Sequence, residues 1–295
     1  MFGLFFGNYL VEKNKISQSQ FDEVMNLQQK ARVKLGLIAV SEKLLTTRQA
    51  EEINDIQRKL DSRFGDIAIE KGYLLAEEVT YLLNMQGNPY LQFVQVVSEH
   101  NILTLEEIET YLEEYRTENG FSKSDIDALK SGDIDRIIPV FIQDPTSLSG
   151  DCISLFLRNI VRFISNNIII KTSYITQEYE AGIIAYQKMV GDHEFFVGFA
   201  SKSDELLSIA NPFAKEEFVT MDEDAFDSVC EFINCTNGLY ASKLSQEDIH
   251  IDMTPPLFYT KKKITTKREL MVIPIIIGGK QSDLLIAVDS LFEID

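Results

Sequence analysis

The residues of this sequence best suited to do chemistry are Glu231 and Asn234, a carboxylate and a carboxamide three positions apart. On a helix, side chains with this spacing lie one above the other, about 5–6 Å apart at Cβ. A carboxylate can form an ion pair, and a carboxamide can hold a water molecule for attack on a phosphoryl group. Neither residue is a strong general base, so the pair would act by positioning. The spacing by itself more often marks two solvated residues on an exposed helix face.

These two residues must be positioned by a helix predicted from about Asp222 to Leu244. Thr220 and Glu223 have the spacing of a capping box at its start. Its apolar stripe, which should face a sheet, consists of Phe226, Val229, Cys230, Ile233, Tyr240 and Leu244.

The sheet is predicted from two hairpin patterns. Strand-like runs 183–189 and 195–200 flank Val190-Gly191-Asp192, and runs 271–277 and 283–288 flank Gly278-Gly279-Lys280. Residues 146–295 are therefore predicted to form an α+β domain, with a mostly antiparallel sheet and long helices on one of its faces.

The first 115 residues repeat with a period of 29. Glycine recurs at positions 7, 36 and 65, and glutamine recurs at positions 28, 57 and 86. Each repeat predicts a short helix, a tight turn and a longer amphipathic helix, and such units must stack on their neighbours to bury their apolar faces. A degenerate fourth copy near Val97 and Ile102 is predicted to be the terminal repeat that caps the stack. We expect an all-helical repeat domain over 1–116, used as a scaffold or for regulation, a linker over 117–145 and a domain break near 140–146.

Composition and charge exclude several classes of protein. The formal charge of −18 repels phosphate backbones, so nucleic-acid binding is not expected. No apolar run reaches the length of about 18 residues that a membrane helix needs, and we expect a cytoplasmic protein without membrane insertion. The three cysteines contain no Cys-x-x-Cys pair and the three histidines stand apart, so no metal site is predicted.

Residues 146–295 contain a pattern made of Glu231-x-x-Asn234, Gly238, Met253-Thr254-Pro255-Pro256 and the hairpin that ends in Leu284–Val288. This pattern carries a resemblance to the CheX members of the CheC/CheX/FliY chemotaxis phosphatases. It implies that Glu231 pairs with a lysine of a phosphorylated CheY-like response regulator, with Gly238 also in the docking surface. It implies that Asn234 orients the water that attacks the aspartyl phosphate.

The same resemblance implies a homodimer, and a magnesium ion that belongs to the response regulator and not to this chain. CheC and FliY proteins carry a second Glu-x-x-Asn, but the corresponding stretch here is Phe156-Leu157-Arg158-Asn159, without an acid. This departure favours the single-site CheX pattern.

The third N-terminal repeat contains Arg63-Phe64-Gly65, Ala68-Ile69, Gly72, Leu74 and Gln86. In these residues it is similar to the cyclic-di-GMP-binding motif of MshEN domains, which occur in GspE-type ATPases. The resemblance implies nucleotide binding at Arg63, Gly65, Gly72 and Gln86. Two hypotheses therefore stand: a phosphatase with a regulatory N-terminal domain, and a non-catalytic adaptor that binds a receiver domain or cyclic-di-GMP.

Overall fold

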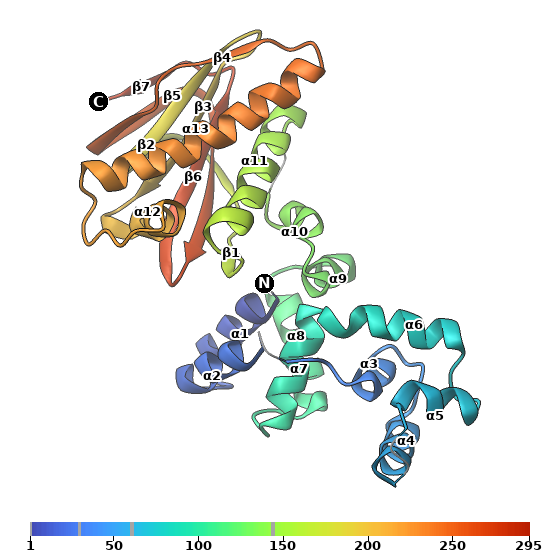
Figure 1. Ribbon diagram of the computed structural model, residues 1–295. Coiled ribbons are helices and arrows are strands. Elements are labelled where there is room, and N and C mark those ends of the chain that lie inside the picture. Colours follow the sequence, from blue (N-terminus) through green and yellow to red (C-terminus); the bar gives the residue numbers. More distant parts are fainter. Residues whose placement is uncertain (1, 29–30, 60–61, 143–144) are drawn as a thin grey trace. The chain divides into compact units, whose positions relative to one another are not determined.

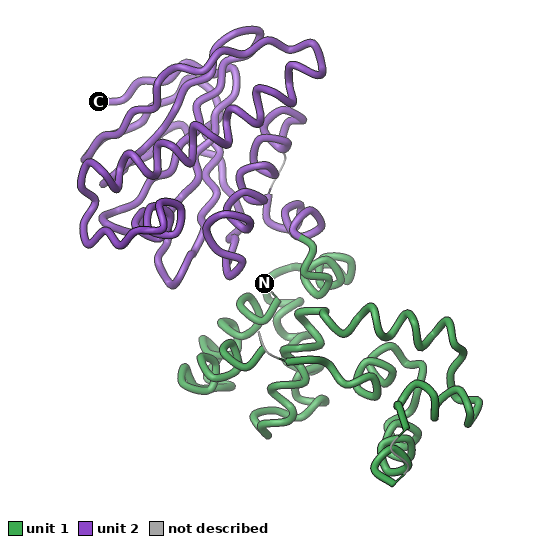
Figure 2. The backbone as a smooth tube through the Cα atoms, viewed as in Figure 1, with its two compact units in different colours: residues 1–133 green, residues 134–295 purple. Residues whose placement is uncertain are grey.

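The computed structural model describes residues 2–28, 31–59, 62–142 and 145–295, and its chain divides into two compact units (Figure 2). Unit 1 is Met1–Asp133 and unit 2 is Ile134–Asp295. The division falls ahead of the break expected near 140–146, of which residues 143–144 lie outside the described residues.

The stretch 117–145, expected as a linker, is shared between the two units and is helical over much of its length. It holds α9 (Lys123–Ser131) in unit 1 and α10 (Ile134–Phe141) in unit 2. Ser122 caps α9 with a reciprocal capping box, and Gly132 ends it at φ 70°. The turn-rich residues of this stretch therefore begin and end helices.

Unit 1 contains four copies of a helix–turn–helix repeat, followed by α9. The bounds are α1 (Phe2–Glu12), α2 (Gln18–Gln28), α3 (Leu35–Ser41), α4 (Thr47–Lys59), α5 (Phe64–Glu70), α6 (Ala76–Asn84), the 3₁₀ turn η1 (Met85–Gly87), α7 (Pro89–Glu99) and α8 (Leu105–Glu118). The turn within each repeat places one residue at positive φ: Asn14, Lys43, Gly72 and Asn101. These residues are 29 positions apart, so the turn conformation recurs with the same period even in the degenerate fourth copy.

The repeated glycines are needed because the two helices of a repeat approach closely. A Cβ on Gly7 would lie 2.3 Å from the ring of Phe21, and a Cβ on Gly65 would lie 2.7 Å from Val79. Phe21 and Val79 occupy equivalent positions of the second helix of their repeats. The glycine therefore serves the packing within the repeat.

The prediction that the fourth repeat ends the stack was wrong. Helix α7 of that repeat contacts α1, α2 and α3, and α8 contacts α1. The rings of Phe2 and Phe6 in α1 pack against Phe93 of α7 at centroid distances of 6.2 and 6.0 Å. Apolar and aromatic residues of the fourth copy thus match the face of the first copy, which makes α7 a central helix of unit 1.

Unit 2 is an α+β domain, as predicted, with a seven-stranded antiparallel sheet and helices on one face of it (Figure 1). Its remaining elements are α11 (Ser147–Asn159), the π-helical turn η2 (Ile160–Ile164), β1 (Ile168–Ile170), β2 (Tyr174–Gly191), β3 (Phe195–Ser201), η3 (Asp204–Leu206), α12 (Leu207–Ala214), α13 (Glu223–Gln246), β4 (Ile251–Met253), β5 (Leu257–Ile277), β6 (Lys280–Val288) and β7 (Phe292–Ile294). Both predicted hairpins are confirmed: β2 pairs with β3, and β5 pairs with β6.

The pairings β2–β3, β3–β6, β6–β5 and β5–β2 form a closed circuit of neighbours. Side chains alternate between the two faces of these strands. On one face, Phe195 and Phe199 contact the aromatic rings of Tyr240 and Phe232 in α13. Gln187 lies on this helix-facing side of β2, since its side chain bonds to α13.

Candidate functional site

The site lies on α13, the helix that crosses the sheet of unit 2 (Figure 1). Its N-cap is Asp222, whose Oδ1 accepts a hydrogen bond of 3.0 Å from the amide of Ala225. The predicted capping box of Thr220 and Glu223 was therefore wrong, because a better-placed acceptor stands one residue before the helix. All six residues of the predicted apolar stripe are buried. This burial fixes which side of α13 faces outward.

Glu231 and Asn234 are neighbours on the outward side of α13. Glu231 is exposed and Asn234 is half-buried. Asn234 Nδ2 lies 3.4 Å from Glu231 Oε2, and the thiol of Cys235 donates to Glu231 Oε1 at 3.2 Å. Burial and this bond to a carboxylate raise the pKa of the Cys235 thiol, so it remains a protonated donor. Glu231 and Asn234 are therefore close enough to act on one small target.

Asn234 is also tied to the sheet by a side chain that the sequence analysis missed. Gln187 of β2 donates from Nε2 to Asn234 Oδ1 at 2.8 Å and to the carbonyl oxygen of Thr254 at 2.8 Å. Its Oε1 accepts from Nδ2 of Asn237 at 2.8 Å. Gln187 is only 1% exposed and Asn237 is fully buried. The signal in the sequence was a glutamine within the strand-like run 183–189.

Gly238 lies one turn beyond Asn234 and faces Met253. A Cβ at this position would lie 3.6 Å from Met253 Cε, which is ordinary contact. A shallow groove of about 480 Å³ runs beside it, lined by Gly238, Ala241, Ser242, Ser245, Ile251, Asp252 and Met253. The structure thus brings the Met253–Pro256 stretch next to α13, close to the Glu231–Asn234 pair.

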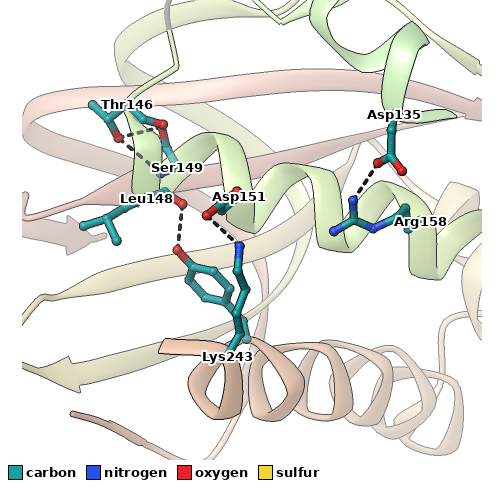
Figure 3. Close-up of polar contacts among 8 residues, drawn as sticks. Asp135, Thr146, Leu148, Ser149, Asp151, Arg158 and Lys243 are labelled. Atoms are coloured by element: carbon teal, nitrogen blue, oxygen red, sulfur yellow. Dashed lines mark hydrogen bonds and ion pairs between the residues drawn. The ribbon is translucent and has the colours of Figure 1, made fainter. Parts of the chain in front are cut away.

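Helix α11 packs along α13 and is anchored to it by polar contacts (Figure 3). Asp151 pairs with Lys243 at 2.6 Å, and the carbonyl oxygen of Leu148 accepts from the hydroxyl of Tyr240 at 2.8 Å. At the other end of α11, Asn159 is buried and donates to Thr236 at 3.1 Å. This asparagine, at the place of a second Glu-x-x-Asn, therefore has a structural role.

The four candidate nucleotide-binding residues have different local surroundings in unit 1. Arg63 is exposed at the N-cap of α5, Gly65 packs against Val79, and Gly72 supplies the turn at φ 69°. Gln86 is engaged within the chain: its Nε2 donates to the carbonyl oxygen of Val33 at 2.7 Å, and its Oε1 accepts from the Arg32 guanidinium at 3.2 Å.

Gln86 belongs to a set of glutamines that hold the connection between the first two repeats. Gln92 and Gln95 donate to the carbonyl oxygens of Ala31 and Arg32, and Gln95 also accepts from the amide of Lys34. The similarity of this unit to MshEN domains stays a prediction.

Two further features concern the described residues. No three histidine, cysteine, aspartate or glutamate side chains among them gather in a way that could hold a metal ion. No helix among them combines the length and apolar character needed to cross a bilayer.

Comparison with known proteins gives a match in unit 2. Residues 183–277 match the family model described as chemotaxis phosphatase CheX. This range contains Gln187, Glu231, Asn234, Gly238 and Thr254, so it covers the whole polar network described above. Residues 183–277 are therefore similar to CheX, and the resemblance predicted from the motifs of the C-terminal region is confirmed. No curated protein sequence matches the chain.

Several solved structures are similar to about half of this chain. The chemotaxis protein CheX of Desulfovibrio desulfuricans is 12% identical, with 48% of this chain and 99% of that chain covered and a TM-score of 0.42. The CheX of Vibrio vulnificus is 15% identical, with the same coverage and TM-score. The CheX–CheY–BeF3–Mg²⁺ complex of Borrelia burgdorferi is 18% identical, with 46% and 94% covered and a TM-score of 0.38.

Proposed function

We propose that unit 2 is a phosphatase that hydrolyses the aspartyl phosphate of a CheY-like response regulator, in chemotaxis or related two-component signalling. The observation that carries the proposal is the Glu231–Asn234 pair, placed on the outward side of α13 within a segment that matches chemotaxis phosphatase CheX. The residues of the pair keep the roles that the resemblance implies for them. Glu231 pairs with a lysine of the receiver, and Asn234 orients the attacking water.

The geometry supports this division of roles. Asn234 is held through its Oδ1, so its Nδ2 points toward Glu231 and the exposed side of the helix. A carboxamide fixed before the partner arrives can align a water molecule without losing further conformational freedom. Gly238 has no side chain, so it lets a partner approach the helix backbone closely. The magnesium ion would come with the receiver.

The remaining parts of the proposal concern the whole chain. Unit 1 serves as a regulatory or interaction domain, unit 2 forms a homodimer, and the protein acts in the cytoplasm. The alternative is an adaptor that binds a receiver without turnover, or that binds cyclic-di-GMP.

The decisive experiment follows the decay of a phosphorylated CheY-type receiver in magnesium, with and without this protein. Faster loss of phosphate in its presence is the expected result. Binding of the receiver with an unchanged decay rate, across several receivers, would favour the adaptor instead.

Glu231→Gln should weaken docking and leave the chemical step nearly intact. The substitution keeps the shape of the side chain but removes its charge, so the ion pair with the receiver lysine is lost. We expect KM to rise on the order of tenfold, with kcat little changed. Steady-state kinetics over a range of phosphorylated receiver concentrations separate the two constants, and a large fall in kcat at constant KM would contradict the docking role.

Cyclic-di-GMP binding makes a separate prediction for unit 1. If the repeats bind this nucleotide, Arg63→Ala should remove the binding, because the exposed guanidinium would contact the phosphates. Arg58→Ala is a matched control, since Arg58 is an exposed arginine of α4 outside the motif. Titration calorimetry measures both variants, and the absence of heat with the wild-type chain ends the hypothesis.

A further inference from the structure

A buried amide network fixes the orientation of the Gln187 side chain. The carbonyl oxygen of Thr254 can only accept, so the end of Gln187 that faces it must be the NH₂ group. The oxygen of Gln187 then faces Asn237, which must present its own NH₂ group in turn. A flipped Gln187 would set its oxygen against that of Thr254. The main chain therefore determines the hydrogen-bond polarity of the network.

The network determines the orientation of Asn234 as well. The second hydrogen of Gln187 Nε2 points at Asn234, whose oxygen must face it. The NH₂ group of Asn234 is thereby directed outward, next to Glu231. An exposed carboxamide without such a partner changes rotamer in picoseconds to nanoseconds. Gln187 thus holds Asn234 in one orientation.

Burying the amide of Gln187 costs free energy, and a side chain that only filled space would not need an amide there. Gln187 lies between the sheet and α13 and is 1% exposed, and burial of a polar group is unfavourable unless it is hydrogen-bonded. The network leaves Asn237 Oδ1 buried without a hydrogen-bond partner among the described residues. Apolar residues of similar volume at both positions would fill the space without this cost. An apolar pair, however, could not hold Asn234.

We propose that Gln187 is a positioning residue of the phosphatase site: it acts through Asn234, setting which end of that carboxamide meets the water and the phosphoryl group. Thr254 and Asn237 hold Gln187 in the orientation that this requires. The inference rests on the proposed phosphatase function and adds to it a residue outside the Glu-x-x-Asn motif, on a different element.

The test compares Gln187→Met with the wild-type protein in the receiver dephosphorylation assay. Methionine has nearly the same length but cannot donate to Asn234. We expect kcat to fall on the order of 10- to 100-fold, because misplacement of a reacting group costs rate in this range. KM should stay the same, since Glu231 is untouched. Ile183→Val, on the same face of β2 and without a hydrogen bond to Asn234, is the matched control and should keep the wild-type kcat.

A double variant distinguishes a loss of positioning from a loss of folding. Gln187→Met with Asn237→Leu replaces both partners of a buried hydrogen bond by apolar groups, which can be nearly neutral for stability. This protein should fold, bind the receiver and show the same loss of kcat. In an Asn234→Ala background, Gln187→Met should cause no further loss, because the two residues act as a unit.

Nuclear magnetic resonance gives a readout that does not depend on turnover. The side-chain NH₂ signals of Asn234 are assigned by their loss in Asn234→Ala. In Gln187→Met their chemical shifts should change, because the hydrogen bond that holds the carboxamide is lost. Unchanged signals, or an unchanged kcat in an active protein, would overturn the role of Gln187. A wild-type protein that is inactive toward every receiver would overturn the phosphatase itself, so the two failures are distinguishable.

Discussion

Asn234→Ala should reduce the decay of a phosphorylated receiver to its spontaneous rate while the protein still folds and still binds the receiver. The carboxamide is the group that orients the attacking water, and alanine offers neither donor nor acceptor. The side chain is half-buried at the edge of the helix, so its removal opens no cavity in the core. The measurement is phosphate release with the variant at concentrations that saturate the receiver.

A matched control for this variant is Cys235→Ser. Cys235 is the next residue, is exposed and also contacts Glu231, so it shares the surroundings of Asn234 but not its proposed role. Serine keeps a donor to Glu231, and turnover should persist. If wild type and Asn234→Ala dephosphorylate the receiver equally fast, the mechanism fails.

Phe232→Ala should destabilise unit 2 by about 3–5 kcal/mol, the usual cost of removing a buried aromatic side chain. Phe232 is 1% exposed, and its ring contacts those of Phe156, Phe199 and Phe213, at centroid distances of 6.4, 5.9 and 5.3 Å. These rings come from α11, β3 and α12. One substitution therefore loosens three elements around the helix that carries the site.

Urea denaturation followed by circular dichroism measures this loss as a shift of the midpoint of the unit 2 transition. Leu239→Ala is the control, because Leu239 lies on the same helix but is 52% exposed, and such surface changes stay within about 0.5 kcal/mol. Equal midpoints for the two variants would contradict the assigned core.

Local patterns predicted the elements that carry the site. The glycine turn at Gly278-Gly279 predicted the β5–β6 hairpin, and both glycines lie at positive φ. The period of helical residues predicted α13 and the adjacency of Glu231 and Asn234. These features depend on neighbours within a few residues, so one sequence is enough to find them.

Features that depend on pairing between distant segments were missed. Gln187 becomes part of the site because the register of β2 sets it opposite Asn234, 47 residues later. The first half of β2 and most of β5 were not predicted as strands, since their exposed positions carry charged residues such as Glu178 and Lys263, which form an ion pair across the two strands.

The order of packing in unit 1 was missed for a related reason. A period of 29 residues indicates that the repeats have similar structures, but it does not indicate which helix faces pack against each other. The match between the first and fourth repeats depends on aromatic residues such as Phe6 and Tyr115, which lie far apart in the sequence.

The closed circuit of strand pairings has a consequence for how the protein behaves once it unfolds. Strand β3 reads FFVGFAS, without charge or proline, which is the composition of segments that form cross-β aggregates. In the folded domain it is buried along its whole length and paired with β2 and β6 on its two sides, so it offers no free edge. Heating that opens unit 2 should release this segment, and thermal unfolding at high protein concentration should then be irreversible.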